Sequence, residues 1–283
     1  MTSNATIVRY VVYMVTIVAT IVVTVGIASR LFYPPTVIAE ESYEKNEGTL
    51  GKACIEHGDL DSMLKKHVTG DRVNYSTFKL DQQALEQYLE RIAKINTDSC
   101  NRNELLALYI NAYNAATILL ILENYPNIKS IKDIPGKKRW DDQRWKVAGE
   151  IHSLSTLEHQ VLRKRFQEPR IHFAINCASI SCPPLRNEAY TPLKLEEQLN
   201  SAATYFNRDF KGVQWDVKES TLVLSRIYDW YKSDFEKDKD LIQYILPFVS
   251  PEDSESLRRK SRDRIGISFS AYDWSLNDIE RNR

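Results

Sequence analysis

The sequence predicts an α+β fold, a single helix-rich domain built around a small mixed or antiparallel sheet. Three observations carry this prediction. Several segments place apolar residues at helical spacing, one long segment is apolar on nearly all sides, and the remaining apolar runs are short and flanked by turn residues, as strands are. With 283 residues, 43% of them hydrophobic, the chain is long enough to bury a sizeable core.

The charged residues balance, with 38 Lys and Arg against 38 Asp and Glu. A net charge of zero without a long basic run predicts no basic surface that could bind the phosphates of a nucleic acid, so we expect no nucleic-acid partner. Four cysteines are too few for a disulfide scaffold. Cys54 and Cys100 stand alone in the sequence, which leaves open whether they are buried, free or paired.

Residues 10–29 form an uncharged run between Arg9 and Arg30. A helix of about 20 residues is about 30 Å long, enough to cross the core of a bilayer. The apolar part of a secretory signal peptide is usually shorter, but Gly26–Ala28 resembles a small-x-small cleavage site, so cleavage stays an alternative. We expect residues 1–31 to be a membrane anchor or signal-anchor that makes the chain a single-pass membrane protein.

Residues 32–53 have the composition of a linker, with two prolines followed by a mixture of Glu, Lys, Asn and Gly. Residues 54–283 are then the globular domain. Because no other segment reads as a membrane span, the simplest orientation places this domain on the extracytoplasmic, periplasmic side.

The strongest helix is expected at residues 103–124. Asn101 and Glu104 fit a capping pair at its start, and a Tyr-Pro pair at 125–126 ends it. Its apolar middle predicts a central helix buried by its neighbours. Asn111 and Asn114 share one face of this helix, where they either bond a neighbouring loop or line a site.

The other predicted elements are shorter. Helices are expected at residues 55–68, 81–94, 155–165, 193–206 and 241–249, and strands at 145–148, 171–175, 222–224 and 265–270.

A thiol and an imidazole lie on neighbouring predicted elements. Glu158 and His159 occupy the helix at 155–165, and Cys177 follows the strand at 171–175. This pattern suggests a thiol-dependent hydrolase or acyl transferase that acts on an amide or thioester of a small molecule or peptide. Cys177 would be the nucleophile, His159 the general base, and Glu158 or Asn111 the group that orients the imidazole.

Simpler interpretations compete with each of these roles. Most free cysteines are small buried hydrophobes, and Ser155 with Glu158 reads as a capping box. Neighbouring helical residues also point about 100° apart, so Glu158 and His159 are not expected to bond each other.

The alternative function is a non-catalytic envelope domain for binding or interaction, stapled by a disulfide between Cys177 and Cys182. Four tryptophans would suit such a binding surface, although aromatic residues at these spacings are often core: Trp140, Trp145, Trp230 and Trp274.

A zinc site built from His159, His172, Cys177 and Cys182 is disfavoured. The spacing matches no zinc signature, and in a strand His172 and Cys177 would point to opposite faces. We therefore expect no metal and no other cofactor.

Four motifs together resemble the bacterial members of a family of unknown function, the one numbered 547: YINAYNA at 109–115, SLSTLEHQVLR at 153–163, HFAINCASISCPPL at 172–185 and AYDWSLND at 271–278. The resemblance spans roughly residue 55 to the C-terminus and implies an exported or anchored protein, but no particular activity.

The resemblance also singles out polar residues. It marks Asn111, Tyr113, Asn114, Glu158, His159, Arg163 and Cys177 as recurrent, whereas the position of Cys182 is more variable, which favours Cys177 as the nucleophile. We accordingly assign Asn114, Tyr113, Arg163 and Cys182 to substrate binding. A papain-like arrangement would bring the thiol and imidazole together, by analogy of fold alone.

Overall fold

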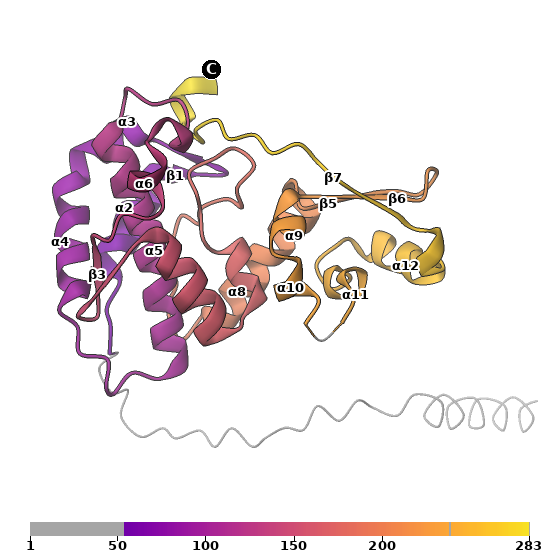
Figure 1. Cartoon of the computed structure of the whole chain (residues 1–283), viewed down its shortest axis with the longest axis horizontal. Coiled ribbons are helices and arrows are strands. Elements are labelled where there is room, and N and C mark those ends of the chain that lie inside the picture. The colour runs from indigo at the N-terminus through magenta and orange to yellow at the C-terminus, as the bar shows by residue number, and fades with distance from the viewer. Residues whose placement is uncertain (1–53, 238, 283) are drawn as a thin grey trace, which may run out of the picture. The chain divides into compact units, whose positions relative to one another are not determined.

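The computed structural model describes residues 54–237 and 239–282 (Figure 1). They belong to one compact unit, Lys52–Arg283, which is a mixed, helix-rich α+β structure with small sheets. The predicted membrane segment at 10–29 and the linker at 32–53 lie outside the described residues.

The helices account for most of the domain. The α-helices described are α2 (Gly58–His67), α3 (Tyr75–Phe78), α4 (Gln82–Ala93), α5 (Arg102–Asn124), α6 (Gly136–Arg139), α7 (Leu154–Thr156), α8 (Leu195–Thr204), α9 (Arg226–Trp230), α10 (Lys232–Phe235), α11 (Leu241–Ile245) and α12 (Pro251–Arg259). The 3-10 helices are η1 (Lys79–Asp81), η2 (Ile131–Asp133), η4 (Pro169–Phe173), η6 (Arg262–Arg264) and η7 (Ile279–Asn282), and the π-helices are η3 (Leu157–Phe166) and η5 (Tyr205–Phe210).

The strands form three small sheets in the described part of the chain, where one sheet was predicted. Two are antiparallel pairs: β1 (Val68–Thr69) with β2 (Arg72–Val73), and β3 (Trp145–Val147) with β4 (Glu150–His152). The third has the order β5 (Val213–Asp216), β6 (Thr221–Leu224), β7 (Gly266–Phe269), with β5 antiparallel and β7 parallel to β6.

The central helix is α5. The Asn101 side chain accepts hydrogen bonds from the backbone amides of Asn103 and Glu104, and the Glu104 side chain accepts one from the Asn101 amide, so the predicted capping pair is formed. All its residues from Leu105 to Leu122 are buried. This is the one helix among the described residues that is long and apolar enough to cross a membrane, and its apolar window is entirely buried in the domain. Its apolar character therefore belongs to the core, against which α4 and η3 pack.

Two hydrophobic clusters make up this core. The larger one surrounds α5 and includes α2, α4 and η3. The smaller one lies between α8, the three-stranded sheet and α9–α11, with Phe173, Phe206, Tyr228 and Phe235 at its centre. Figure 1 shows the C-terminal segment leaving β7 and returning across the domain toward α3. There the backbone of Val73 donates to Asn277 over 2.9 Å.

The predicted strand at 171–175 is wrong. Residues Pro169–Phe173 form the 3-10 helix η4, in which Pro169 supplies a helical φ and the Glu168 side chain caps the Arg170 amide over 3.0 Å. A short apolar run does not distinguish a strand from a buried helical turn. His172 therefore lies in a helical turn, and the expectation that His172 and Cys177 point to opposite faces of a strand is wrong.

The helix predicted at 155–165 begins one residue earlier, as α7, and continues as the π-helix η3. Ser153, rather than Ser155, caps it by accepting from the Thr156 amide over 3.0 Å. The capping role considered for Glu158 is therefore wrong, and this side chain is available for other contacts.

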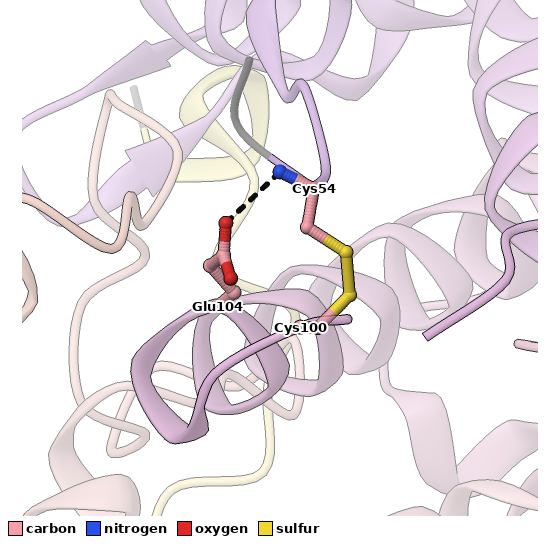
Figure 2. A group of neighbouring side chains, drawn as sticks. All are labelled: Cys54, Cys100 and Glu104. Atoms are coloured by element: carbon pink, nitrogen blue, oxygen red, sulfur yellow. Dashed lines mark hydrogen bonds between the residues drawn. A yellow bond between two sulfur atoms is a disulfide. The ribbon is translucent and has the colours of Figure 1, made fainter. Parts of the chain in front are cut away.

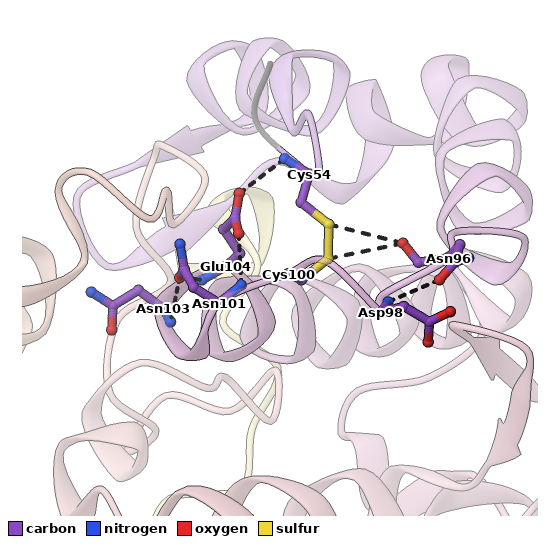
Figure 3. Close-up of a disulfide and its surroundings, with 7 residues drawn as sticks. All are labelled: Cys54, Asn96, Asp98, Cys100, Asn101, Asn103 and Glu104. Atoms are coloured by element: carbon purple, nitrogen blue, oxygen red, sulfur yellow. Dashed lines mark hydrogen bonds between the residues drawn. A yellow bond between two sulfur atoms is a disulfide. The ribbon is translucent and has the colours of Figure 1, made fainter. Parts of the chain in front are cut away.

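Cys54 and Cys100 form a disulfide, with their Cα atoms 5.5 Å apart (Figure 2). The Cys54 amide also donates to Glu104 over 2.9 Å, and Glu104 accepts from the Asn101 amide over 2.8 Å (Figure 3). These bonds tie the beginning of the described chain to the first turn of α5. Cys54, Cys100 and Glu104 lie close enough to share a metal ion, but both sulfurs are used by the disulfide, so no thiolate remains to bind one.

Candidate functional site

A pocket of about 370 Å³ lies where α5, η3, the loop after η4 and the C-terminal segment meet. Its polar lining includes Glu158, His159, His172, Cys177 and Cys182. The volume falls within the range of small-molecule sites, about 300–1,000 Å³. The structure therefore brings the predicted thiols and His159 to one cavity.

The loop that carries Cys177 is fixed by two buried asparagines. Asn114 donates to the carbonyl of Ala174 over 3.0 Å and accepts from the Asn176 amide over 2.9 Å. Asn176 in turn donates to the carbonyl of Pro183 over 2.8 Å and accepts from the Ala178 amide over 2.8 Å. Asn114, predicted to bind substrate, thus holds the loop that carries Cys177.

The C-terminal segment holds the same loop from the other side. Ile180 donates to the carbonyl of Ser275 over 2.9 Å, and the Asp273 amide donates to the hydroxyl of Ser181 over 2.9 Å. These bonds place the Tyr272 ring beside Cys177.

The Cys177 thiol is half-buried and surrounded by hydrogen-bonding groups. Its sulfur lies 3.1 Å from the Ser179 hydroxyl and 3.3 Å from the Tyr272 hydroxyl. The hydrogen bond with Cys182 lowers the pKa of Cys177, and those with Ser179 and Tyr272 add to this effect against the opposing effect of burial. Burial raises the pKa of Tyr272, which therefore stays a neutral hydroxyl able to donate.

Cys177 and Cys182 are both free thiols, so the disulfide of the alternative prediction is not formed. Instead, the Cys177 amide donates to the Cys182 sulfur over 2.8 Å. Burial raises the pKa of Cys182 well above its usual range, and Cys177 adds to this effect. The pair therefore consists of one thiol inclined to ionise and one held protonated.

Glu158 is 9% exposed and accepts hydrogen bonds from two tyrosines. The donors are Tyr113, over 3.2 Å, and Tyr231, over 2.5 Å. Its carboxylate is 4.0 Å from Nδ1 of His159, too far for a hydrogen bond. Glu158 therefore does not orient the imidazole.

His159 is oriented by Arg163, whose Nη1 lies 3.1 Å from its Nδ1. Because a guanidinium only donates, Nδ1 must accept, and the neutral ring carries its proton on Nε2. In this tautomer Nε2 offers an N–H rather than a lone pair. This arrangement does not fit the predicted role of His159 as general base.

Asp234 links Arg163 to His172. It accepts two hydrogen bonds from Arg163, over 2.6 and 2.9 Å, and one from Nε2 of His172 over 2.8 Å. Although burial opposes it, these bonds hold the pKa of Asp234 well below its usual range. Burial lowers the pKa of His172, which stacks on Tyr231 with ring centroids 4.0 Å apart. Arg163 is thus a positioning residue for the pocket wall, whereas it was predicted to bind substrate.

Asn111 lies away from the imidazole. It donates to the backbone carbonyl of Tyr190 over 2.8 Å and accepts from the Tyr190 amide over 3.0 Å. Both ends of the amide are occupied, so its predicted part in orienting His159 is wrong.

Aromatic rings form another wall of the pocket. Trp230 stacks on Trp274 with centroids 5.8 Å apart, and Tyr272 lies 4.8 Å from Trp230 and 4.6 Å from Trp274. Trp140 also lines the pocket, whereas Trp145 is buried in the core. The tripeptide Tyr-Asp-Trp occurs at 228–230 and at 272–274, and each copy contributes its tryptophan to this wall.

The fold and this pocket define a helix-rich α+β domain that presents a half-buried, hydrogen-bonded thiol to an aromatic cavity. Residues 97–206 match the model of a family described as "Protein of unknown function, DUF547". The matched segment contains α5, η3 and the Cys177 loop, and it supports the family resemblance of the sequence motifs. No curated protein and no solved structure matches the chain.

Proposed function

We propose that the domain is a thiol-dependent hydrolase or acyl transferase with Cys177 as its nucleophile. One observation carries the proposal: the thiol with the lowered pKa lies on the wall of the pocket, within hydrogen-bonding distance of two hydroxyl groups. Hydrogen bonds of this kind favour the thiolate, which is the reactive form of a cysteine.

The reaction would proceed through an acyl-enzyme. The Cys177 sulfur forms a bond to the substrate carbonyl carbon, and the bond from that carbon to the leaving group breaks. A water or acceptor nucleophile then attacks the acyl group, gives its proton to Glu158, and releases the thiolate. The Nε2–H of His159 would stabilise the oxyanion as a donor.

Among the predicted substrates, this arrangement favours a thioester over an amide. A leaving thiolate needs no proton, whereas an amine leaving group needs an acid, and His159 in its Nε2–H tautomer would become an imidazolate if it gave one up. A papain-like site would need a direct thiol–imidazole pair, and the contact of His159 with Arg163 weighs against it.

The domain would work outside the cytoplasm, anchored by residues 10–29. The disulfide between Cys54 and Cys100 supports this part of the proposal, because such bonds persist mainly in oxidising compartments. The second candidate function is a non-catalytic envelope domain that binds or interacts through the same pocket, favoured by the exposed Trp230 and its stack on Trp274.

The deciding experiment measures alkylation of Cys177 by iodoacetamide between pH 5 and 9, followed by a screen of acyl thioesters. We expect an apparent pKa below the usual value of about 8.5 and thioester turnover that disappears in Cys177→Ala. An ordinary thiol pKa, or turnover that survives in Cys177→Ala, would overturn the enzyme proposal. The binding function would then be tested by ligand-induced changes in the fluorescence of Trp230.

A further inference from the structure

The charged side chains that line the pocket in the described part of the chain are carboxylates, beside the two imidazoles of His159 and His172. Among the described residues that line it, Glu158 and Asp141 are acidic, and none is lysine or arginine. Arg163, behind His159, is neutralised by its two hydrogen bonds to Asp234. A ligand that enters the pocket therefore meets two carboxylates, two imidazoles and the sulfur of Cys177.

Glu158 can accept further donors. Its carboxylate accepts from the hydroxyls of Tyr113 and Tyr231, both neutral donors, and two carboxylate oxygens have about four acceptor sites. It is 9% exposed and lines the pocket. A buried carboxylate with two neutral partners favours a cationic ligand beside it.

The aromatic wall favours the same ligand. The rings of Trp230, Tyr272 and Trp274 are clustered, and Trp140 and Tyr231 join them around the pocket. The face of an indole or phenol ring attracts a cation, which is why such rings surround quaternary ammonium ligands. Lys132 already places its ammonium 4.2 Å from the centroid of Trp274.

We infer that the pocket selects substrates that carry a protonated or quaternary amine close to the bond that Cys177 attacks. The inference rests on the proposed function for the role of Cys177, and it adds the charge class of the substrate. The amine would lie against the indole rings, with Glu158 supplying the counter-charge. An anionic acyl group would be repelled by the carboxylate.

Three methanethiosulfonate reagents test this without knowledge of the substrate: the cationic trimethylammonioethyl, the anionic sulfonatoethyl and the neutral methyl reagent. In each reaction Cys177 forms a disulfide with the reagent sulfur, and a sulfinate leaves. The protein carries Cys182→Ser throughout, so that no second thiol can displace the label. Rates are divided by those of a free small thiol, which removes the intrinsic reactivity of each reagent.

We expect the cationic reagent to be preferred over the anionic one by about tenfold or more, because a charge within a few ångströms is weakly screened in a pocket. Glu158→Gln removes the charge while keeping one acceptor oxygen for the two tyrosines, and it should remove most of this preference. The matched control is Glu197→Gln, an exposed carboxylate in the first turn of α8 outside the pocket, which should leave the preference unchanged.

Equal normalised rates, or a preference for the anion, would overturn the inference. A neutral reagent that reacts slowly with protein retaining Cys182, combined with a persistent cation preference, would instead count against the activated thiol, so the two proposals fail separately. If Glu158→Gln does not fold, the test is whether tetramethylammonium protects Cys177 from reaction with the neutral reagent. Protection should be kept in Trp230→Phe and weakened in Trp230→Leu, and its absence in the unsubstituted pocket would contradict the cation site.

Discussion

Arg163 fixes the tautomer of His159 by donating to its Nδ1 over 3.1 Å while holding Asp234 with its other nitrogens. The imidazole is the residue most readily taken for a general base from the sequence. The contact makes it a hydrogen-bond donor toward the pocket. The distinction decides which chemistry the site supports, because a donor stabilises developing negative charge and does not remove a proton.

The tautomer is directly measurable. In nitrogen-15 NMR spectra of the imidazole, His159 should show a protonated Nε2 and an unprotonated Nδ1 near neutral pH. Arg163→Gln removes the guanidinium donor and should produce a mixture of tautomers. Arg208→Gln, which removes an exposed arginine paired with Asp209, should leave the His159 signals unchanged. A protonated Nδ1 in the unsubstituted protein would contradict the assignment.

The Tyr272 hydroxyl contributes to the lowered pKa of Cys177. Tyr272→Phe removes this donor and should raise the pKa, because one hydrogen bond to the thiolate is lost. We expect alkylation at pH 7 to slow by about fivefold, the equivalent of a bond worth about 1 kcal/mol. Tyr205→Phe, on an exposed ring, is the control. An unchanged pH profile in Tyr272→Phe would contradict this role and show that Ser179 and Cys182 alone lower the pKa of Cys177.

Local sequence signals located the central helix well. Asn101, Glu104 and the Tyr-Pro pair predicted residues 103–124, and α5 spans Arg102–Asn124. Caps and prolines act within a few residues, so the sequence alone reveals them. The apolar run that follows Pro169 has no comparable local signal that distinguishes a strand from a helical turn. It forms a 3-10 helix whose apolar side chains pack into the core.

The site was only partly predictable for the same reason. Cys177 and His159 were found because each lies in a distinctive motif. Asp234 was missed, since it lies 71 residues from Arg163 and 62 from His172, and no local pattern marks it as their partner. The tautomer of His159 follows from a contact that only the structure supplies. Spatial partners far apart in the chain are the part that sequence reasoning could not reach.

His57 predicts a pH dependence of stability. Burial, with a smaller effect from Arg91, lowers its pKa to about 4, and its buried Nε2 has no hydrogen-bond partner among the described residues. The unfolded chain binds this proton near pH 6.5 and the native domain does not, so stability is full above pH 6.5 and falls as the pH drops toward 4. The loss from this group is about 3 kcal/mol. In His57→Gln, urea unfolding should show a correspondingly shallower decline, and parallel curves for the two proteins would contradict the assignment.

The disulfide between Cys54 and Cys100 closes a loop over a sequence separation of 46. Loop closure of this length should stabilise the domain by up to about 4 kcal/mol, through the entropy of the unfolded chain. The double variant Cys54→Ser with Cys100→Ser should unfold at lower urea concentration than the unsubstituted protein. Reductant should destabilise the latter and leave the variant unaffected. Equal sensitivity of both proteins to reductant would place the effect at Cys177 and Cys182 instead.

Asn111 and Asn114 are a matched pair that separates stability from reactivity. Both are buried on α5, and each makes two hydrogen bonds to a distant backbone segment: Asn111 to Tyr190, Asn114 to the loop of Cys177. Replacing either by alanine leaves a buried donor and acceptor unpaired, which should destabilise the domain by about 1–3 kcal/mol in urea unfolding. Only Asn114→Ala releases the segment that positions Cys177, so only this variant should change the alkylation rate and its pH profile. If both variants lost reactivity equally, the reactivity of Cys177 would depend on the overall stability of the domain. The hydrogen bonds of Asn114 to the Cys177 loop would then have no specific part in the site.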